Sequence, residues 1–328
     1  MNTIKLNTIG TPIGGGGNSG NGGGSASKWT GHADAEGLKA IGWTDEDIAY
    51  YQENGVNWNA EDDEYHKVSD DNKALYGVLT ADNIVDYKDR IVYLPKIDTS
   101  GVTDMGYMFD NCTSLVSIPQ LNTQNVTDMS GMFCYCYSLV SIPQLNTQNV
   151  TCMFNMFSCC YSLISIPQLD TQNVTDMGNM FYYCHCLASI PPLNTQNVTN
   201  MADMFDGCTS LISIPQLDTQ NVTDMGNMFC DCSTLVSIPQ LNTQNVTNMA
   251  DMFDGCYTLT TANLENVATD CQLTSARLSK ESLLYLINNE AAESAVTIKL
   301  ASYAYTRLAE DADIVAALAN HPNISLAK

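Results

Sequence analysis

The chain has 328 residues and a formal net charge of −23, with only 13 Lys and Arg residues. A chain with this negative charge does not attract polyanions, so electrostatic binding to nucleic acid or to anionic membranes is excluded. No apolar run approaches the about 18 residues of a membrane span, so no membrane insertion is expected. The negative charge is expected to keep a repetitive, apolar-cored protein soluble.

Residues 1–28 combine a short peptide with a Gly-rich linker. Residues 14–25 read GGGGNSGNGGGS, a composition typical of flexible tethers. The preceding segment has one lysine and no apolar core region, so it is not expected to be a secretory signal. Ile4, Leu6 and Ile9 are expected to anchor the chain by adding a strand to a virion or surface assembly partner. The alternative is a disordered tail.

Residues 29–92 are predicted to form a helical N-terminal cap. Thr44, Ser69 and Thr80 each precede a segment with helical spacing and can act as N-caps. This region also holds the three tryptophans of the chain, which favours a small aromatic core. Its expected role is to cover the first apolar face of the repeats that follow. The acidic run 61–64 lacks the pattern of a calcium loop and is interpreted as a solvated loop.

Residues 93–263 repeat with a period of 24 residues, giving about seven units. Two methionine series and one phenylalanine series follow this period, as do two further series: Pro95, Pro119, Pro143, Pro167, Pro191, Pro215 and Pro239; Cys112, Cys136, Cys160, Cys184, Cys208, Cys232 and Cys256. A fixed period of this length predicts a solenoid in which each unit buries its apolar face against its neighbours. This is the strongest pattern in the sequence.

Each unit is predicted to contain one short helix and one short strand. Thr127 is a candidate N-cap, with Met129, Met132 and Phe133 on one side of the helix that would follow. Leu139 and Ile142 would then point inward from an extended segment. One strand and one helix per 24 residues predicts an α/β repeat fold, the leucine-rich-repeat solenoid.

The order C-x-S-L-x-S-I-P followed by N-V-T-D-M-x-x-M-F resembles the BspA-like leucine-rich repeats of bacterial surface proteins. The resemblance covers about residues 93–262, with seven copies in phase. It implies a non-catalytic binding or adhesion scaffold and brings no catalytic residues with it. A weaker resemblance links the C-terminal region to tails that follow such repeats in tailed-phage structural proteins.

Residues 264–328 break the repeat and predict a small α/β C-terminal cap. Ser279 is a candidate N-cap for a helix through residues 280–290, and residues 296–300 alternate as a strand. A second helix is expected over 309–319, with a closing strand at 324–326.

The cysteines and histidines show no pattern of a metal or catalytic site. The periodic cysteines are interpreted as buried, reduced core residues. In Cys184-His185-Cys186 the residues are too close in sequence to converge readily on one metal ion. The four histidines are scattered, and no nucleophile motif accompanies them. We therefore expect no enzyme activity, no metal and no cofactor.

Differences between the copies gather around the periodic cysteine and predict a tyrosine-rich surface with an acidic end. Stacked repeats would place these positions side by side. The expected contact residues for a protein or glycan partner on a host surface are Tyr135, Tyr137, Tyr161, Tyr182, Tyr183, His185 and Tyr257. The alternative is neutral variation at exposed positions. The Asn-Val-Thr triplets match the glycosylation sequon, but we interpret the asparagines as structural turn residues.

These features lead to a non-catalytic recognition or structural module as the functional hypothesis. The first version is a bacteriophage virion appendage or decoration protein that is assembled in the cytoplasm and serves host attachment. The second version is a bacterial cell-surface leucine-rich-repeat adhesin. An intracellular scaffold is a third possibility.

Overall fold

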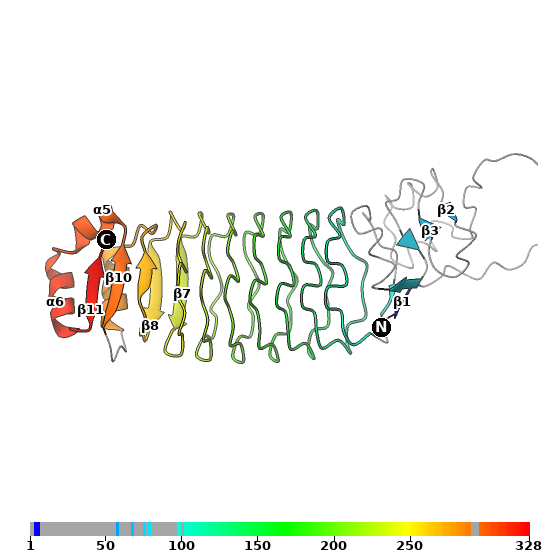
Figure 1. The fold of residues 1–328 in the computed structure, drawn as a ribbon, viewed down its shortest axis with the longest axis horizontal. Helices are drawn as coiled ribbons and strands as arrows, with labels where there is room; N and C mark the ends of the chain where they lie inside the picture. Colours follow the sequence, from blue (N-terminus) through cyan, green and yellow to red (C-terminus); the bar gives the residue numbers. More distant parts are fainter. Residues whose placement is uncertain are drawn as a thin grey trace, which may run out of the picture.

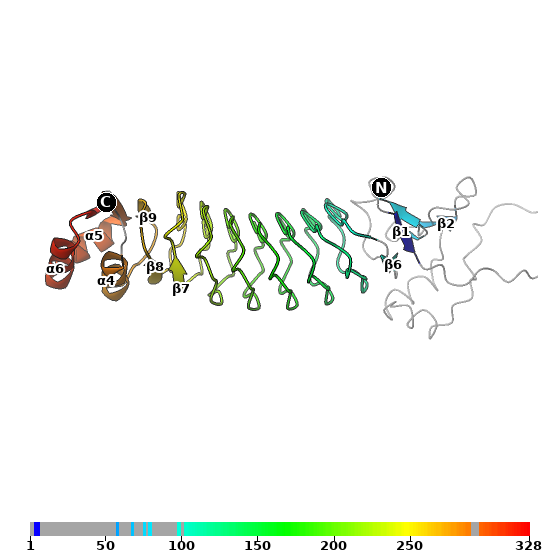
Figure 2. The same ribbon diagram turned by 90° about the horizontal axis from the view of Figure 1, so that it is seen from below.

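The computed structural model describes residues 3–6, 57–58, 67–68, 75–76, 78–80, 97–99, 102–289 and 295–328. From residue 102 onward, successive 24-residue repeats form coils stacked along one axis, and a small α/β region follows at the C-terminal end (Figures 1 and 2). Parallel β-bridges join equivalent residues of neighbouring coils: Asp104, Asp128, Cys152, Asp176, Asn200, Asp224 and Asn248. The predicted solenoid is confirmed.

The core of the solenoid consists of ladders of identical side chains. The Phe109 to Phe253 series is fully buried, and its neighbouring ring centroids lie 5.6–5.8 Å apart in near-parallel stacks. Both methionine series and two leucine series are buried beside it. Because each coil covers the apolar face of the next, stability rests on contacts between neighbours.

The predicted short helix of each unit is wrong. The segment after Asp128 is a series of turns, because alternate N–H groups donate to the next coil instead of to their own segment. Met129 N donates to Cys152 O at 3.1 Å, and Phe133 N donates to Met156 O at 2.9 Å. An α-helix would need these same N–H groups for its internal bonds.

Thr127 does not act as a helix cap. Its Oγ1 donates to Thr103 O at 3.2 Å, one coil earlier. Asp128 takes the local role, since its Oδ1 accepts the N–H of Ser130 at 2.7 Å in an Asx turn. The carboxylate thus shapes the turn that leads into the buried methionines.

The inward-pointing segment of each unit is extended but forms few regular ladders. Leu139 and Ile142 are buried as predicted. Between residues 102 and 270, all of them described, regular strands occur at β7 (Ser237–Asn242), which pairs in parallel with β8 (Thr261–Glu265). Proline in this segment has no N–H to donate, which limits the ladder. Side chains also join the coils: Thr123 Oγ1 donates to Asn146 O at 2.8 Å.

The structural interpretation of the Asn-Val-Thr asparagines is confirmed. Asn149 Nδ2 donates to Gln124 O of the preceding coil at 2.8 Å, and equivalent bonds of 2.7 Å recur at Asn173, Asn197, Asn221 and Asn245. These side chains form an asparagine ladder along the solenoid. Their amide groups are therefore used in holding neighbouring coils together.

The periodic cysteines are buried, as predicted, and also bind neighbouring coils. Cys160 Sγ donates to Phe133 O at 3.1 Å, and the same bond recurs along the series at 3.0–3.2 Å. Burial raises the pKa of these thiols, for Cys256 to about 12. A neutral thiol is the form that can donate to the carbonyl.

The N-terminal region is described only in its strands: β1 (Thr3–Leu6), β2 (Asn57–Trp58), β3 (Lys67–Val68), β4 (Leu75–Tyr76), β5 (Val78–Thr80) and β6 (Ile97–Asp98). β1 lies between β5 and β6 and pairs antiparallel with both. β2, β3 and β4 form a second antiparallel sheet. The expected helix after Ser69 is therefore wrong at Leu75–Tyr76. The helices expected after Thr44 and Thr80 and the 61–64 loop fall outside the described residues, as do Trp29 and Trp43 of the expected tryptophan core, whereas Trp58 lies in β2.

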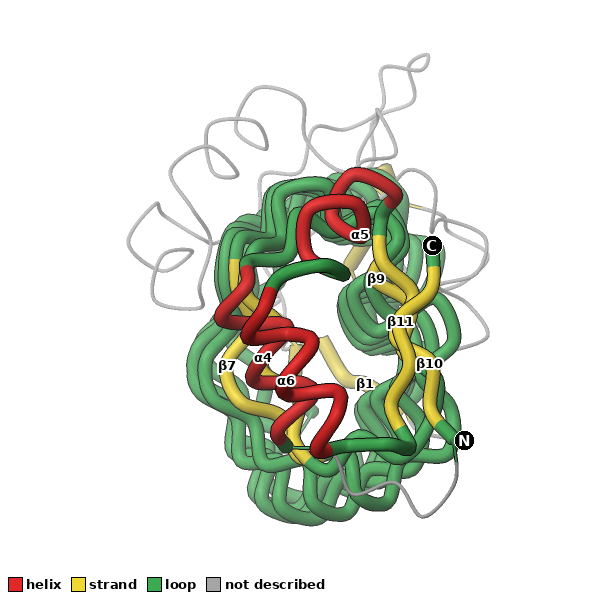
Figure 3. Tube along the Cα trace, turned by 90° about the vertical axis from the view of Figure 1, so that its left-hand side faces the viewer, coloured by secondary structure: helices red, strands yellow, loops and turns green. Residues whose placement is uncertain are grey.

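The C-terminal region is an α/β unit built on a parallel sheet in the order β11-β10-β9. Its elements are β9 (Cys271–Leu273), α4 (Lys280–Asn288), β10 (Val296–Leu300), α5 (Ser302–Leu308), α6 (Ala312–Asn320) and β11 (Ile324–Ala327). Figure 3 shows α4 and α6 side by side across the end of the solenoid. The helix after Ser279, the strand at 296–300 and the strand at 324–326 are confirmed. Helix α5 was not predicted, and the helix expected over 309–319 begins only at Ala312.

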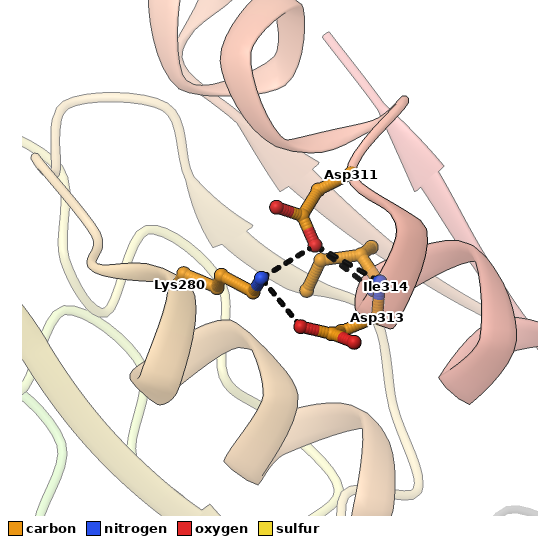
Figure 4. Close-up of polar contacts among 4 residues, drawn as sticks. All are labelled: Lys280, Asp311, Asp313 and Ile314. Carbon is orange, nitrogen blue, oxygen red and sulfur yellow. Dashed lines mark hydrogen bonds and ion pairs between the residues drawn. The ribbon is translucent and has the colours of Figure 1, made fainter.

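One basic residue joins the two packed helices of this region. Lys280 Nζ, at the start of α4, lies 2.8 Å from Asp311 Oδ1 and 2.6 Å from Asp313 Oδ2 (Figure 4). Asp311 is the N-cap of α6 and accepts the N–H groups of Asp313 and Ile314. No helix in the described part of the chain has both the length and the apolar character of a membrane span.

Candidate functional site

The expected tyrosine-rich surface lies on one edge of consecutive coils. We use the name tyrosine strip for six residues whose rings form one continuous chain of contacts, in the order Tyr135, Tyr137, Tyr161, His185, Tyr183 and Tyr182. The turns around the buried cysteine of each coil present these side chains at the surface. Tyr135, Tyr137 and Tyr161 are each more than one-third exposed.

The centre of the strip is a stack of three rings. Tyr137 and Tyr161 have centroids 4.7 Å apart and planes 8° from parallel, and His185 continues the stack 5.1 Å from Tyr161. The stack repeats at the spacing of neighbouring strands, about 4.8 Å. Threonines occupy the equivalent positions of the flanking coils, Thr113 and Thr209.

The stacking decides which ring surfaces a partner can reach. Within the stack Tyr137 and His185 cover the two faces of the central Tyr161 ring, so the exposed part of Tyr161 lies at its edge. Sugars usually pack their C–H groups against an open aromatic face, whereas protein side chains also pack against ring edges. This arrangement therefore suits a protein partner better than a glycan.

Hydrogen bonding fixes the orientation of His185. Its Nδ1 lies 2.9 Å from Gly207 O. Because a carbonyl oxygen only accepts hydrogen bonds, Nδ1 carries the proton, and in the neutral ring Nε2 is left as an acceptor. The strip thus offers a ring nitrogen beside the tyrosine hydroxyl groups.

Tyr135 and Tyr183 occupy a strained backbone position. Their φ angles are 59° and 57°, in the left-handed region that disfavours bulky residues. Gly207 and Gly255 occupy the same repeat position, with φ of 72° and 71°. Asn111, Cys159 and Asp231 occupy this position in the other coils, also with positive φ, and tyrosine is the bulkiest residue of the series.

Three phenols of the strip, those of Tyr161, Tyr182 and Tyr183, have raised pKa values. Burial raises the pKa of Tyr182 to about 12, and the Asp206 carboxylate adds to this effect. For Tyr183 the Asp206 carboxylate is the larger cause of its raised pKa, followed by burial. Burial also raises the pKa of Tyr161. These hydroxyl groups can therefore both donate and accept hydrogen bonds at neutral pH.

Tyr257 is separate from the strip. It shares the repeat position of Tyr137, but Thr209 and Ser233 fill that position in the coils between His185 and Tyr257. Tyr257 is 59% exposed and makes no ring contact with the strip. The structure therefore brings six of the seven expected contact residues together.

Sequence reasoning missed a ladder of exposed aliphatic residues three positions after the ring stack. Val140, Ile164, Ile212 and Val236 are exposed, Ile164 to 56%. Their backbones are linked from coil to coil, with Val140 N donating to Val116 O and Ile164 N donating to Val140 O at 3.1 Å. The 24-residue spacing could have revealed this ladder, because β-branched or aliphatic residues recur at positions 140, 164, 212 and 236.

A second surface feature is an open groove lined by amide side chains. It has a volume of about 1040 Å³ and includes Gln120, Gln144 and Gln168 among its lining residues. Each of these glutamines donates through Nε2 to a backbone carbonyl of the next coil at 2.6 Å. The groove therefore presents a row of glutamine amides held by bonds between coils, with Leu121, Leu145 and Leu169 also in its lining.

The acidic end of the surface begins beside Tyr183. Asp206, Cys230 and Asp231 place their oxygen and sulfur atoms within 4.8 Å of one another. These are the described residues that can together offer a metal ion three ligands. Ile4 and Leu6, two of the expected anchor residues, lie in β1 within the sheet of this chain, and Ile9 falls outside the described residues.

Comparison with known proteins gives one family and several distant structures. No curated protein matches the chain. A leucine-rich-repeat protein of T. pallidum is 22% identical with a TM-score of 0.41, covering 62% of this chain and 90% of that chain. A chain of a TLR13–ssRNA13 complex is 11% identical with a TM-score of 0.17, covering 63% of this chain and 54% of that chain. Residues 83–190 and 162–267 match one family over more than half of the sequence, and the chain belongs to that family, described as "Mycoplasma protein of unknown function, DUF285".

Proposed function

We propose that this chain is a non-catalytic recognition module on a bacterial cell surface, and that the tyrosine strip binds a protein partner. The observation that carries the proposal is the ring stack of Tyr137, Tyr161 and His185, with its edges exposed and an aliphatic ladder alongside. Tyrosine supplies contact area with few rotatable bonds, and exposed apolar patches mark interaction surfaces.

A bacterial surface is favoured over a virion as the place of display. The resemblance of the repeats to BspA-like surface proteins points to a cell surface, and the matching family is described from Mycoplasma. Labelling of intact source cells with an impermeant reagent, followed by mass spectrometry, tests the location. Detection of this chain at the surface would support display, whereas its recovery in stoichiometric amounts from phage particles would restore the virion hypothesis.

The partner surface is tested by cross-linking in the full chain. A photoreactive phenylalanine analogue placed at Tyr161 is expected to capture a discrete protein on cells or extracellular material of the natural environment. The matched control carries the same analogue at Tyr303, which is also exposed but lies on α5. Equal capture from both positions, or none from Tyr161, would contradict the proposal.

The amide-lined groove supports a second candidate, glycan binding. Rows of rigid amide groups and backbone carbonyls suit the hydroxyl groups of an extended sugar chain. A glycan array separates the two candidates. Specific glycan binding that survives alanine at Tyr137 and Tyr161, but is lost with Gln144→Ala, would place recognition in the groove.

A further inference from the structure

Three potential metal ligands converge where two neighbouring coils meet. Asp206 and Cys230 occupy the same position of successive coils, and Asp231 follows Cys230. A carboxylate oxygen from each aspartate and the Cys230 sulfur all lie within 4.8 Å of one another. Stacking of the coils therefore assembles the group from residues 24 positions apart.

Asp206 is buried with an unused ligand atom. Its side chain is only 9% exposed, and Asp206 Oδ1 is one of two buried side-chain oxygens in the described residues without a hydrogen-bond partner. A buried carboxylate oxygen without a donor or a cation is costly.

The solenoid provides no basic side chain to neutralise this group. No Lys or Arg occurs between Lys96 and Arg277. Within the described residues, the ion pairs are those of Lys280 at the C-terminal end. A proton or a metal ion is therefore what remains to balance the buried carboxylate.

The surrounding backbone fixes the ligands in place. Gly207 N donates to Cys230 O at 2.8 Å, and Asp231 N donates to Asp254 O at 2.7 Å. A Cβ atom at Gly255 would lie 2.2 Å from Asp231 Oδ1, so the absence of a side chain there makes room for the carboxylate. Asp254 is not counted as a ligand because its Oδ1 accepts the Ser275 hydroxyl at 2.8 Å.

We propose that Asp206, Cys230 and Asp231 bind one zinc-type divalent ion. A thiolate ligand favours Zn²⁺ over Ca²⁺ and Mg²⁺, which prefer oxygen alone. Three protein ligands leave a fourth tetrahedral position for water. Tetrahedral Zn²⁺ brings its donor atoms to about 3.5 Å from one another, and the three side chains here already lie within 4.8 Å. The ion joins two coils beside Tyr183.

Zinc titration of the reduced, chelator-treated full chain tests the proposal. We expect one tight site per chain by calorimetry and an increase in melting temperature on addition of ZnCl₂. Co²⁺ in place of Zn²⁺ is expected to give a thiolate-to-metal charge-transfer band in the near ultraviolet. Cys230→Ser should weaken binding at least tenfold and remove this band, whereas the matched variant Cys186→Ser, with its exposed thiol away from the cluster, should retain both.

Three results would overturn the assignment. They are unchanged zinc affinity in Cys230→Ser, loss of the cobalt band in Cys186→Ser, and equal stabilisation by Ca²⁺, which would indicate an oxygen-only site. If circular dichroism shows that Cys230→Ser does not fold, Asp206→Asn replaces it as the test variant. The amide keeps the size of the side chain, and unchanged zinc affinity in this folded variant would equally contradict the proposal.

Discussion

Tyr137 and Tyr161 stack at the surface with ring centroids 4.7 Å apart, closer than the 5.6–5.8 Å of the buried phenylalanine rings. A stacked pair at the surface still leaves ring edges and hydroxyl groups in contact with water. The phenylalanine rings are fully buried, so their burial stabilises the fold, whereas Tyr137 and Tyr161 are each 36% exposed and bury a smaller fraction of their surface on folding. This contrast separates the stabilising ladder of the solenoid from its candidate recognition surface.

Replacing both surface rings is expected to abolish partner binding without unfolding the protein. Tyr137→Ala with Tyr161→Ala removes the contact area but leaves the buried ladders intact, so we expect at least a hundredfold loss of affinity, or about 3 kcal/mol. Surface plasmon resonance against the partner protein that cross-linking identifies measures the change in affinity. Tyr257→Ala is the matched control because it removes a tyrosine at the same repeat position outside the stack. Equal losses in both variants would exclude a specific role for the strip.

Glycine is expected to be better tolerated than alanine at Tyr183. The φ angle of 57° places this residue in the left-handed region, where a Cβ atom costs about 1 kcal/mol and glycine avoids the cost. We therefore expect Tyr183→Gly to be about 1 kcal/mol more stable than Tyr183→Ala in urea unfolding, with both variants losing partner binding. A more stable alanine variant would mean that this turn is not left-handed in solution.

Much of the solenoid could be predicted because one physical rule repeats. A 24-residue period puts equivalent residues side by side, so Phe133 next to Phe157 and Tyr137 next to Tyr161 follow from the sequence alone. The same rule predicts the buried thiols. For this reason the residues of the strip could be predicted from the sequence. Tyr257 lies apart from them because Thr209 and Ser233, which have no ring, fill the same repeat position in the two coils between.

The turns and the metal cluster could not be predicted in this way. The spacing of Met129, Met132 and Phe133 fits a helix, but bonds from alternate N–H groups to the next coil outweigh that local pattern. Asp206 and Cys230 show no local ligand spacing because they lie one full repeat of 24 residues apart in sequence. In the C-terminal region, Asp311 is the N-cap of α6, so this helix begins at Ala312 and not at residue 309 as expected.

The buried phenylalanine ladder is expected to dominate stability. Phe157 is fully buried between Phe133 and Phe181, at centroid distances of 5.6 and 5.7 Å. Phe157→Ala leaves a cavity between coils and is expected to cost about 3–5 kcal/mol. Urea unfolding followed by circular dichroism measures the change. The control is Ile164→Ala in the same coil. Because Ile164 is 56% exposed, this change should alter the free energy of unfolding by no more than about 0.5 kcal/mol.

The contact of Lys280 with α6 is expected to make the C-terminal region sensitive to acid. Lys280 lowers the pKa of Asp311, mainly through their hydrogen bond. A lowered folded-state pKa gives stability that is present above the ordinary carboxylate pKa of about 3.9 and is lost as the pH falls through the folded value. Lys280→Gln should therefore melt slightly lower than wild type at pH 7, by no more than about 2 °C for so exposed a pair.

The size of that difference across pH distinguishes an ion pair from simple packing. If Lys280 acts through charge, the wild-type and Lys280→Gln melting curves converge in acid, where the Asp311 carboxylate is protonated. In an Asp311→Asn background, part of the effect of Lys280→Gln should already be missing at pH 7, because one of its two carboxylate partners is gone. A difference that persists unchanged in acid would show instead that the Lys280 side chain supports α6 through its methylene groups.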